Sequence, residues 1–390
     1  MKLMLLDGYS TRTLACVRSF GKRGIPFVVG GHTRWDMSLY SRYCREGFVY
    51  TSPYVSISGF VADVQANAVR FDADIVLPTS EAAIVACNLA RDQLGVELLA
   101  PSHEEVDVLF QKRETLQLTR SAGVPIPRSH TIDAETASSL TDLDIRPPIV
   151  IKPNRSESIL GDRIVRGGST VYAYSQSELI DKATTMLARS PEILVQEFVN
   201  GYGVGISGVF KAGQPVTLFG HRRIRESNPL GGPSAVAVSI CISDALYDAT
   251  ARIMRPTGYT GAAMVEYKVD RESGLTYFME VNGRLWGSIL LPIAAGLDLP
   301  YILWRVATGR EVPSDGRYRE GVVGRNLLGD TKHLVTVLRG RPKGWPGHFP
   351  TRWQALREYL SLFLAESHGL LYASDDPKPA LARVLQEVLA

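Results

Sequence analysis

The chain has 390 residues, 45% of them hydrophobic, which is enough for two or three globular units with cores of their own. Its net charge of +3 lacks the basic excess of a nucleic-acid-binding protein. The four cysteines form no Cys-x-x-Cys pair, which argues against a zinc site and a disulfide scaffold. The N-terminal apolar run is too short for a signal peptide, and prolines break the most apolar later stretch. We therefore expect a soluble cytoplasmic protein that binds neither nucleic acid nor membrane.

Residues 1–100 have the pattern of a parallel α/β unit. Short apolar runs lie at 3–6, 26–31 and 74–79, and helical patterns follow the first and the last of them. Strands that alternate with helices predict a parallel sheet with crossover connections. The loop after the first run, DGYSTRTLA, lacks the G-x-G-x-x-G pattern, so a scaffold or substrate domain is favoured over a nucleotide site.

Residues 101–193 begin with a capping box, in which Ser102 is the N-cap and Glu105 follows three residues later. One helix is expected from there to Gly123, which is typical of a C′ position. A buried strand at 149–153 precedes a polar, glycine-containing loop at 154–170 and a second capped helix.

From 194 to 310 strands dominate the pattern. LVQEFV comes first, and strand-like runs between about 203 and 283 predict an antiparallel sheet, interrupted by one helix. The tail, 311–390, is expected to be mainly helical, and no chemistry is assigned to it. The predicted fold therefore combines α/β and α+β architecture, with a parallel N-terminal domain, antiparallel sheets in two lobes and a helical C-terminal extension.

The segment FMEVNGRLWGS, which begins at residue 278, raises the strongest chemical expectation. Read with a period of two, it places Glu280, Asn282 and Arg284 on one face of a strand. The turn signal DRESG precedes it, and a hairpin centred on the serine of this turn puts Glu266 opposite Glu280 and Met264 opposite Asn282. Two opposed carboxylates repel each other, and a divalent cation removes the conflict. Carboxylate and amide oxygens predict Mg²⁺ or Mn²⁺ on Glu266, Glu280 and Asn282, completed by phosphate oxygens and water.

Two features qualify this expectation. An exposed hairpin face with incidental charges is the alternative reading, and a slip of one residue in the register would send Glu266 to the other face. Arg284 continues the polar face and could hold an anion beside the metal.

Other segments could hold the phosphates and the base of a nucleotide. Lys152 ends an apolar strand, and Lys112 lies in a helix whose other face is apolar. A short glycine segment can bring backbone N–H groups close to an anion, although an ordinary turn is the alternative. The strand end at 197–199 can offer backbone hydrogen bonds to a purine. The expected ATP-binding residues are Lys112, Lys152, Gly168, Ser169, Glu197, Phe198 and Val199.

The basic segment GHRRIRESNPLGGPSA is the expected substrate-binding segment. Arginine can bind a carboxylate or a phosphate through two parallel hydrogen bonds, and a glycine-rich loop follows. Strand alternation puts Arg223 and Arg225 on one face and Arg222 on the other, whereas a solvated basic strand edge is the alternative. The expected substrate-binding residues are Arg222, Arg223, Arg225 and Gly232.

Taken in order, these segments resemble the ATP-grasp superfamily, and most closely its branch of carbamoyl-phosphate synthetases and biotin carboxylases. The motifs that carry the resemblance are FQKRETLQLTRSAGVPIPRS, VIKP, LVQEFVNG and MVEYKVDRESGLTYFMEVNGRLWGS. The resemblance covers roughly residues 1 to 310. It implies a pre-ATP-grasp domain at 1–100, an N-terminal lobe at 101–193, a C-terminal lobe at 194–310 and an extension at 311–390.

The resemblance also implies roles for single residues. Lys112 and Lys152 would contact the phosphates and the adenine side of ATP, and the segment 197–199 would be the adenine hinge. Glu266, Glu280 and Asn282 would be the metal ligands, and Arg284 would be an anion-stabilising catalytic residue. Arg223, from the basic segment, is the second expected catalytic residue. Two departures stand out: Gly203 occupies the position at which many relatives carry a ribose-binding acid, and the phosphate loop reads RGGST instead of the usual pattern.

The function expected on this basis is ATP-dependent ligation of a small carboxylate, amino-acid-like in character, to an amine through an acyl phosphate, by an enzyme that could be a homodimer. Three alternatives stay open. They are a carboxylase or carbamoyl-phosphate-type enzyme that activates bicarbonate, an ATP-grasp kinase, and a nucleotide-binding module without catalysis.

Overall fold

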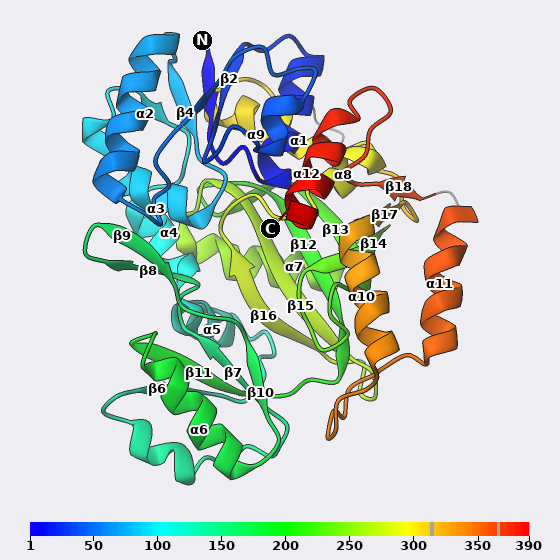
Figure 1. Ribbon diagram of the computed structural model, residues 1–390. Helices are drawn as coiled ribbons and strands as arrows, with labels where there is room; N and C mark the ends of the chain where they lie inside the picture. The colour runs from blue at the N-terminus through cyan, green and yellow to red at the C-terminus, as the bar shows by residue number, and fades with distance from the viewer. Residues whose placement is uncertain (313–315, 365–366, 390) are drawn as a thin grey trace.

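The described residues form three sheets and a separate hairpin, shown in the computed structural model of Figure 1. The structure describes residues 1–312, 316–364 and 367–389. Within those ranges, no helix combines the length and the apolar character that crossing a membrane requires. The predicted mixed α/β and α+β fold is confirmed.

The N-terminal unit contains the predicted parallel sheet, in the strand order β3-β2-β1-β4-β5. Helix α1 packs on one face of it, and helices α2 and α3 pack on the other. Strands β1, β2 and β4 are buried throughout, which explains why they read as continuous apolar runs. The elements are β1 (Leu3–Leu5), α1 (Thr11–Lys22), β2 (Phe27–Gly31), η1 (Met37–Tyr40), β3 (Gly47–Val49), α2 (Ile57–Phe71), β4 (Ile75–Leu77), α3 (Glu81–Leu89), η2 (Arg91–Gln93) and β5 (Glu97–Leu98).

The single helix expected after the capping box is wrong, because the chain breaks it at Gln111 into α4 (His103–Phe110) and α5 (Lys112–Ser121). Gln111 has an extended backbone, with φ of −99° and ψ of 111°. Asn154 stabilises the break, because its backbone oxygen accepts from Lys112 N at 3.1 Å and its side chain accepts from the next backbone N–H at 2.8 Å. The capping box of Ser102 and Glu105 is confirmed. The break makes Lys112 the first residue of a helix that faces the loop after β7.

The smaller antiparallel sheet has the order β10-β7-β11-β6, and α6 covers it. Its elements are β6 (Ser129–Asp133), η3 (Ala137–Thr141), β7 (Ile149–Pro153), β10 (Val171–Ala173), α6 (Gln176–Leu187) and β11 (Glu192–Glu197). The hairpin of β8 (Glu157–Leu160) and β9 (Arg163–Arg166) extends from this sheet to the N-terminal unit (Figure 1). Ile164 N donates to Pro53 O at 2.9 Å, and Ile57 N donates to Asp162 O at 2.7 Å. The hairpin is therefore anchored on the N-terminal unit.

The large sheet has the order β16-β15-β12-β13-β14-β17-β18. Helices α4, α5 and α7 pack on one face, and α8 and α9 pack on the other, where they share a core with the N-terminal unit. Its elements are β12 (Gly201–Lys211), β13 (Gln214–Glu226), β14 (Ser234–Ile240), α7 (Asp244–Met254), η4 (Arg255–Thr257), β15 (Gly261–Asp270), β16 (Thr276–Asn282), α8 (Leu290–Ala295), α9 (Leu299–Ala307), β17 (Val323–Arg325) and β18 (His368–Gly369).

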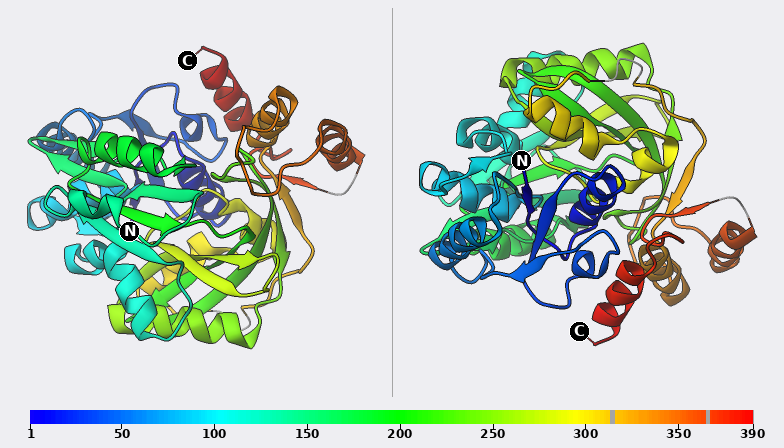
Figure 2. Two further views of the ribbon diagram at one scale, coloured as in Figure 1. Left: turned by 90° about the horizontal axis from the view of Figure 1, so that it is seen from below. Right: turned by 90° about the horizontal axis from the view of Figure 1, so that it is seen from above.

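The C-terminal segment is mainly helical, as expected, but it also supplies β17 and β18 to the large sheet. Both views of Figure 2 show its helices on one side of the molecule. These helices are α10 (Leu327–Arg339), α11 (Arg352–Leu364) and α12 (Lys378–Leu389). The segment returns to the N-terminal unit, where buried Asp376 accepts from Arg18 Nε at 2.9 Å. The division of the chain at residues 100, 193 and 310 stays a prediction.

Candidate active site

The hairpin of β15 and β16 places Glu266 opposite Glu280 and Met264 opposite Asn282, so the predicted register is confirmed at these positions. Nearer to the turn the register shifts by one residue, and Tyr267 pairs with Phe278. The extra residue, Met279, forms a β-bulge. Without the bulge, Met279 would lie opposite Glu266, and the carboxylate pair would not form.

An amide and a guanidinium hold the carboxylate pair. Asn282 Nδ2 donates to Glu266 Oε1 at 3.1 Å and to Glu280 Oε1 at 3.4 Å, and Arg223 Nη2 donates to Glu266 Oε2 at 2.5 Å. Burial raises the pKa of Glu266 against the opposing charge of Arg223. Burial acts upward on the pKa of Glu280 as well, but Lys112 and Lys152 outweigh it and the pKa is lowered. Glu280 is therefore held in the ionised form that a metal ligand needs.

Two glycines in β12 let side chains of β13 lie across that strand. A Cβ atom on Gly203 would stand 2.7 Å from Arg223 Cδ, and one on Gly205 would stand 2.2 Å from His221 Cε1. The open space allows Arg223 to reach Glu266 on β15. His221 is buried, and burial, followed by the charge of Arg223, lowers its pKa to about 3, so that its ring is neutral. Gly203, where a ribose-binding acid is missing, thus has a packing role.

Changing Gly205 to alanine is expected to destabilise the protein by about 1–3 kcal/mol, the usual cost of overpacking a core, because the new methyl group would collide with the His221 ring. Urea unfolding measures the effect. Gly287→Ala is the matched control, since a Cβ atom at that position meets nothing within 4 Å. Equal free energies of unfolding for the two variants would contradict the packing role of Gly205.

Two lysines approach the carboxylate pair from β7 and α5. Lys152 is 6% exposed, and its Nζ donates to Met279 O at 3.5 Å. Burial lowers the pKa of Lys152 to about 8, although the charge of Glu280 acts in the opposite direction. Lys112 Nζ donates to Ser156 Oγ at 3.4 Å, in the loop after β7. The structure thus brings both predicted phosphate-binding lysines to Glu280.

The prediction that Arg284 continues the strand is wrong, because β16 ends at Asn282 and Gly283 packs against Leu109. Arg284 Nη1 donates to Leu285 O at 3.1 Å. Its Nε lies 3.9 Å from Oε2 of Glu81, the first residue of α3. Burial raises the pKa of Glu81 and of Glu266, and the charge of Arg284 opposes that rise. The same charge contributes to the lowered pKa of Glu280. Arg284 therefore stands between the carboxylate pair and the N-terminal unit.

The predicted substrate arginines Arg222, Arg223 and Arg225 all line one cavity of about 620 Å³. Their side chains have different partners, because the register shifts between Arg223 and Arg225 and interrupts the alternation. Arg223 also donates to Gly232 O at 3.3 Å, which joins two of the predicted substrate residues. Arg222 is exposed, with its guanidinium over the ring of Tyr202. Arg225 is buried in an ion pair of 2.7 Å with Asp330. This ion pair joins Arg225 to the C-terminal segment at the wall of the cavity, and its contact with a substrate stays a prediction.

The predicted adenine hinge lies at the end of β11. The Glu197 carboxylate accepts from Arg128 N at 2.8 Å, and Glu197 N donates to Arg128 O at 2.9 Å, so Glu197 is paired with Arg128 through both its side chain and its backbone N–H. Val199 is buried, and the Phe198 ring packs edge-on against Tyr172 and against Trp345 of the C-terminal segment, with centroids 6.1 and 5.2 Å away. Gly168 and Ser169, the predicted phosphate-loop donors, are exposed in the connection between β9 and β10.

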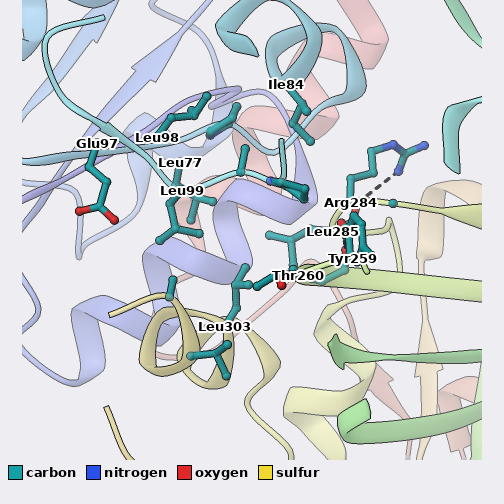
Figure 3. Close-up of a pocket in the computed structure, with 18 residues that line it drawn as sticks. Leu77, Ile84, Glu97, Leu98, Leu99, Tyr259, Thr260, Arg284, Leu285 and Leu303 are labelled. Carbon is teal, nitrogen blue, oxygen red and sulfur yellow. Dashed lines mark hydrogen bonds between the residues drawn. The ribbon is translucent and has the colours of Figure 1, made fainter. Parts of the chain in front are cut away.

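A cavity of about 620 Å³ lies beside the hinge and the carboxylate pair. It is lined by residues of β12, β13, β15 and the C-terminal segment, among them Phe198, Gly203, Arg223, Lys268, His333 and Trp345. A smaller pocket of about 170 Å³, drawn in Figure 3, has mostly apolar walls such as Leu77, Leu99 and Leu303. Figure 3 shows the guanidinium of Arg284 pointing away from those walls. The polar 620 Å³ cavity is therefore the better place for a nucleotide.

The donor set fits Mg²⁺ or Mn²⁺. In the described ranges, no group of three or more His, Cys, Asp or Glu side chains could hold a metal ion by itself. Two carboxylates and one amide are the hard, incomplete ligand set that suits a cation shared with phosphate oxygens and water. Glu266, Glu280 and Asn282 would hold that cation.

The sequence reasoning missed several residues of the N-terminal unit and its anchored hairpin. Glu81 begins α3, Arg12 lies in the first turn of α1, and Glu157 begins β8; the charge of Arg284 acts on the pKa of each. The signal available for Glu81 and Arg12 was their place after the first and the third predicted strands, where the ends of parallel strands meet.

Comparison with known proteins was made by sequence and by structure. The family model described as "Carbamoyl-phosphate synthase L chain, ATP binding domain" matches residues 111–314. A putative urea carboxylase of Emericella nidulans is 27% identical over 293 residues, which cover 71% of this chain and 22% of that protein. Biotin carboxylase 1 of Bacillus subtilis is 26% identical over 238 residues, 57% of this chain and 50% of that protein. The chain thus spans half or less of these two curated relatives.

Solved structures share the fold. A biotin carboxylase from Campylobacter jejuni superimposes with a TM-score of 0.66 at 16% identity, covering 82% of this chain and 74% of that one. An L-amino acid ligase from Bacillus licheniformis gives a TM-score of 0.63 at 15% identity, covering 83% and 78%. Because the family model covers more than half of the chain, the chain belongs to the family of the carbamoyl-phosphate synthase large-chain ATP-binding domain, within the ATP-grasp superfamily.

Proposed function

We propose that the chain is an ATP-dependent carboxylate–amine ligase that releases ADP and phosphate. The observation that carries the proposal is the register-matched pair of Glu266 and Glu280, bridged by Asn282 and flanked by the cations of Lys112, Lys152 and Arg223. Such a site supplies charge and position, which are the main demands of phosphoryl transfer.

ATP would lie between the two antiparallel sheets. The nucleoside would occupy the 620 Å³ cavity beside Phe198 and the hinge backbone, and the phosphates would extend toward Lys112 and Lys152. Gly168 and Ser169 would close over the phosphates from the connection between β9 and β10. Bound Mg²⁺ or Mn²⁺ would neutralise phosphate charge. The three ligands would fix its place, and Arg223 would keep the Glu266 carboxylate oriented.

The reaction would proceed in two steps. A carboxylate oxygen of the substrate attacks the γ-phosphorus, the bond to the β-phosphate oxygen breaks, and an acyl phosphate and ADP result. An amine then attacks the acyl carbon and expels phosphate to form an amide. Arg284 would stabilise the negative charge that develops on the acyl oxygen, and water would have to be excluded from the intermediate.

Bicarbonate is the second candidate for the acid, because a putative urea carboxylase and a biotin carboxylase are among the relatives by sequence. Its activation would give carboxyphosphate by the same first step. The remaining alternatives are a kinase, which would phosphorylate its substrate without ligation, and a nucleotide-binding module without catalysis. Localisation in the cytoplasm and assembly as a homodimer stay predictions.

The test is ADP release from ATP and Mg²⁺ in the presence of pooled small carboxylic acids and hydroxylamine. Hydroxylamine traps an acyl phosphate as a hydroxamate, so the natural amine need not be known. We expect hydroxamate with one pool of acids. ADP release with bicarbonate alone would favour the second candidate, and ADP release without hydroxamate from any organic acid would favour a kinase.

A further inference from the structure

The carboxyl edge of the N-terminal sheet has the geometry of a ligand site. Strand β1 pairs with β2 on one side and with β4 on the other, so the connections after β1 and β4 diverge there. Crevices at such points are where open α/β sheets bind ligands. Buried Asp7 joins the two connections, because its carboxylate accepts from Thr79 N at 2.9 Å and from Ser80 N at 2.7 Å. Arg12 and Glu81 follow directly on these connections.

Arg12 is a cation without a partner at this edge. It is partly buried, and none of the described residues forms a hydrogen bond or an ion pair with its guanidinium. Burial and the like charge of Arg284 both lower its pKa. The start of α1 also contacts the loop after β16, because Thr11 Oγ1 donates to Gly287 O at 3.2 Å. Arg12 and Arg284 therefore stand together, and the donors of the Arg12 guanidinium, which no described residue uses, can bind an anion from outside the chain.

The carboxylates of Glu157 and Glu81 lie near Arg12 and Arg284. Glu157 Oε1 accepts from Tyr54 Oη at 2.7 Å, whereas its Oε2 is buried and has no partner among the described residues. Glu81 is buried, and Arg284 at 3.9 Å is its ion-pair partner. Burial raises the pKa of Glu157 to about 7, and the charge of Glu81 adds to the rise. Two buried acceptors held near each other require a donor, and an ammonium group provides three.

The β8–β9 hairpin brings Glu157 to this position. Ile164 of the hairpin is buried in the core of the N-terminal unit, and Ser56 and Ser58 bind Asp162 at its tip. The guanidinium of Arg166 lies over the Tyr54 ring, 4.8 Å from its centroid, and fixes the residue that binds Glu157. The acidic side of the crevice is thus built from a different part of the chain than the basic side.

We propose that this crevice binds the acid to be activated as a zwitterionic amino acid, with its carboxylate between Arg12 and Arg284 and its ammonium group between Glu81 and Glu157. The inference rests on the proposed ligase function and names its substrate class. Bicarbonate and simple acids lack the cationic donor and would leave Oε2 of Glu157 without a partner. The carboxylate of the bound amino acid would lie beside Arg284, on the side of the metal ligands. There it would attack the γ-phosphate.

The experiment compares acids that differ only in the α-ammonium group: alanine with propionate, aspartate with succinate, and glutamate with glutarate. Hydroxamate formation is followed for the wild type, Glu157→Gln, Arg12→Met and the exposed control Glu135→Gln. We expect the wild type to prefer an amino acid over its deaminated partner by about 100-fold or more in kcat/KM, because a buried polar site rejects a ligand that leaves it unpaired.

The variants should separate the two ends of the crevice. Glu157→Gln should reduce the preference for the amino acid over the deaminated acid at least about tenfold, and Arg12→Met should raise KM for both acids. Equal rates for amino acid and deaminated acid, or an unchanged preference in Glu157→Gln, would overturn the inference but leave the ligase function standing. Thermal unfolding and binding of a non-hydrolysable ATP analogue verify that each variant is folded.

A calorimetric titration of the same amino acids, with Mg²⁺ and the ATP analogue present, tests the crevice even if no hydroxamate forms. Binding that weakens in Glu157→Gln would support the inference while the proposed ligation failed. No binding of any amino acid in this titration would overturn the inference.

Discussion

Glu280→Gln is expected to lower Mg²⁺-dependent ADP release by about 1,000-fold while the protein stays folded. Glu280 is the central carboxylate of the site, because Lys112 and Lys152 both interact with its charge and Asn282 donates a hydrogen bond to it. Glutamine keeps the shape and removes the negative charge, so the cation and the phosphates lose their common anchor. Steady-state ADP release at varied Mg²⁺ concentration measures the loss.

The control for Glu280→Gln is Glu272→Gln, an exposed residue in the turn of the same hairpin, which should behave as the wild type. Thermal unfolding of the Glu280 variant should show a single transition with a midpoint below that of the wild type, since the lowered pKa of Glu280 means that its charge stabilises the folded chain at neutral pH. Activity within about threefold of the wild type would remove Glu280 from the proposed metal site.

Lys152→Met is expected to abolish binding of ATP and at the same time to leave the free protein at least as stable as the wild type. Lys152 is 6% exposed, and burial lowers its pKa to about 8 from the ordinary 10.5. The charged form is thereby disfavoured in the folded state by about 3 kcal/mol. Methionine fills the same space without a charge, whereas phosphate oxygens lose the ammonium that would bind them.

The stability difference between the wild type and Lys152→Met should depend on pH, because the pKa of Lys152 is lower in the folded chain than in the unfolded chain. At pH 7 Lys152 is protonated in both the folded and the unfolded chain, so the whole destabilisation applies to the wild type. Between pH 8 and about 10.5 the folded chain binds fewer protons than the unfolded chain, so the destabilisation disappears as the pH rises. The stability advantage of Lys152→Met should therefore be largest at pH 7 and shrink toward pH 10.

Urea unfolding at these pH values and titration with an ATP analogue check both halves of the prediction. Lys211→Met, at an exposed lysine that ends β12, is the control and should change neither quantity. A Lys152 variant that binds the analogue as tightly as the wild type would contradict the assignment of this lysine to the phosphates.

The metal-binding hairpin could be predicted from the sequence because opposed positions in a hairpin follow from its turn. Even so, the agreement depends on a feature that the sequence does not signal. The pairs next to the turn, such as Tyr267 with Phe278, are one residue away from the predicted register, and only the bulge at Met279 restores the pairing of Glu266 with Glu280. A regular hairpin with this turn would have placed the two carboxylates out of register.

Interruptions of regular structure account for the other differences between the prediction and the structure. The helix through Gln111 has the composition of one continuous helix, but Asn154, far along the chain, binds the backbone at the break. Arg225 lies in a segment with the sequence pattern of a strand, whereas its ion-pair partner Asp330 belongs to a helix of the C-terminal segment. Such partners are chosen by tertiary packing, which local patterns do not contain.

The crevice residues of the N-terminal unit and the β8–β9 hairpin lie outside the sequence motifs that identified the metal site. Arg12, Glu81 and Glu157 come from three elements and meet Arg284 only when the units are assembled. The general rule for parallel sheets pointed to the ends of β1 and β4, but it could not name the hairpin that completes the crevice.

The most direct measurement of the central claim uses the acid identified in the hydroxamate screen, labelled with ¹⁸O in its carboxylate. The enzyme is incubated with this acid, ATP, Mg²⁺ and an amine, and the inorganic phosphate is analysed by mass spectrometry. Activation of the carboxylate by ATP predicts one ¹⁸O atom in each phosphate released, because the carboxylate oxygen that attacks the γ-phosphorus leaves with it. Phosphate without ¹⁸O would mean that water attacked ATP, and it would contradict the ligase mechanism.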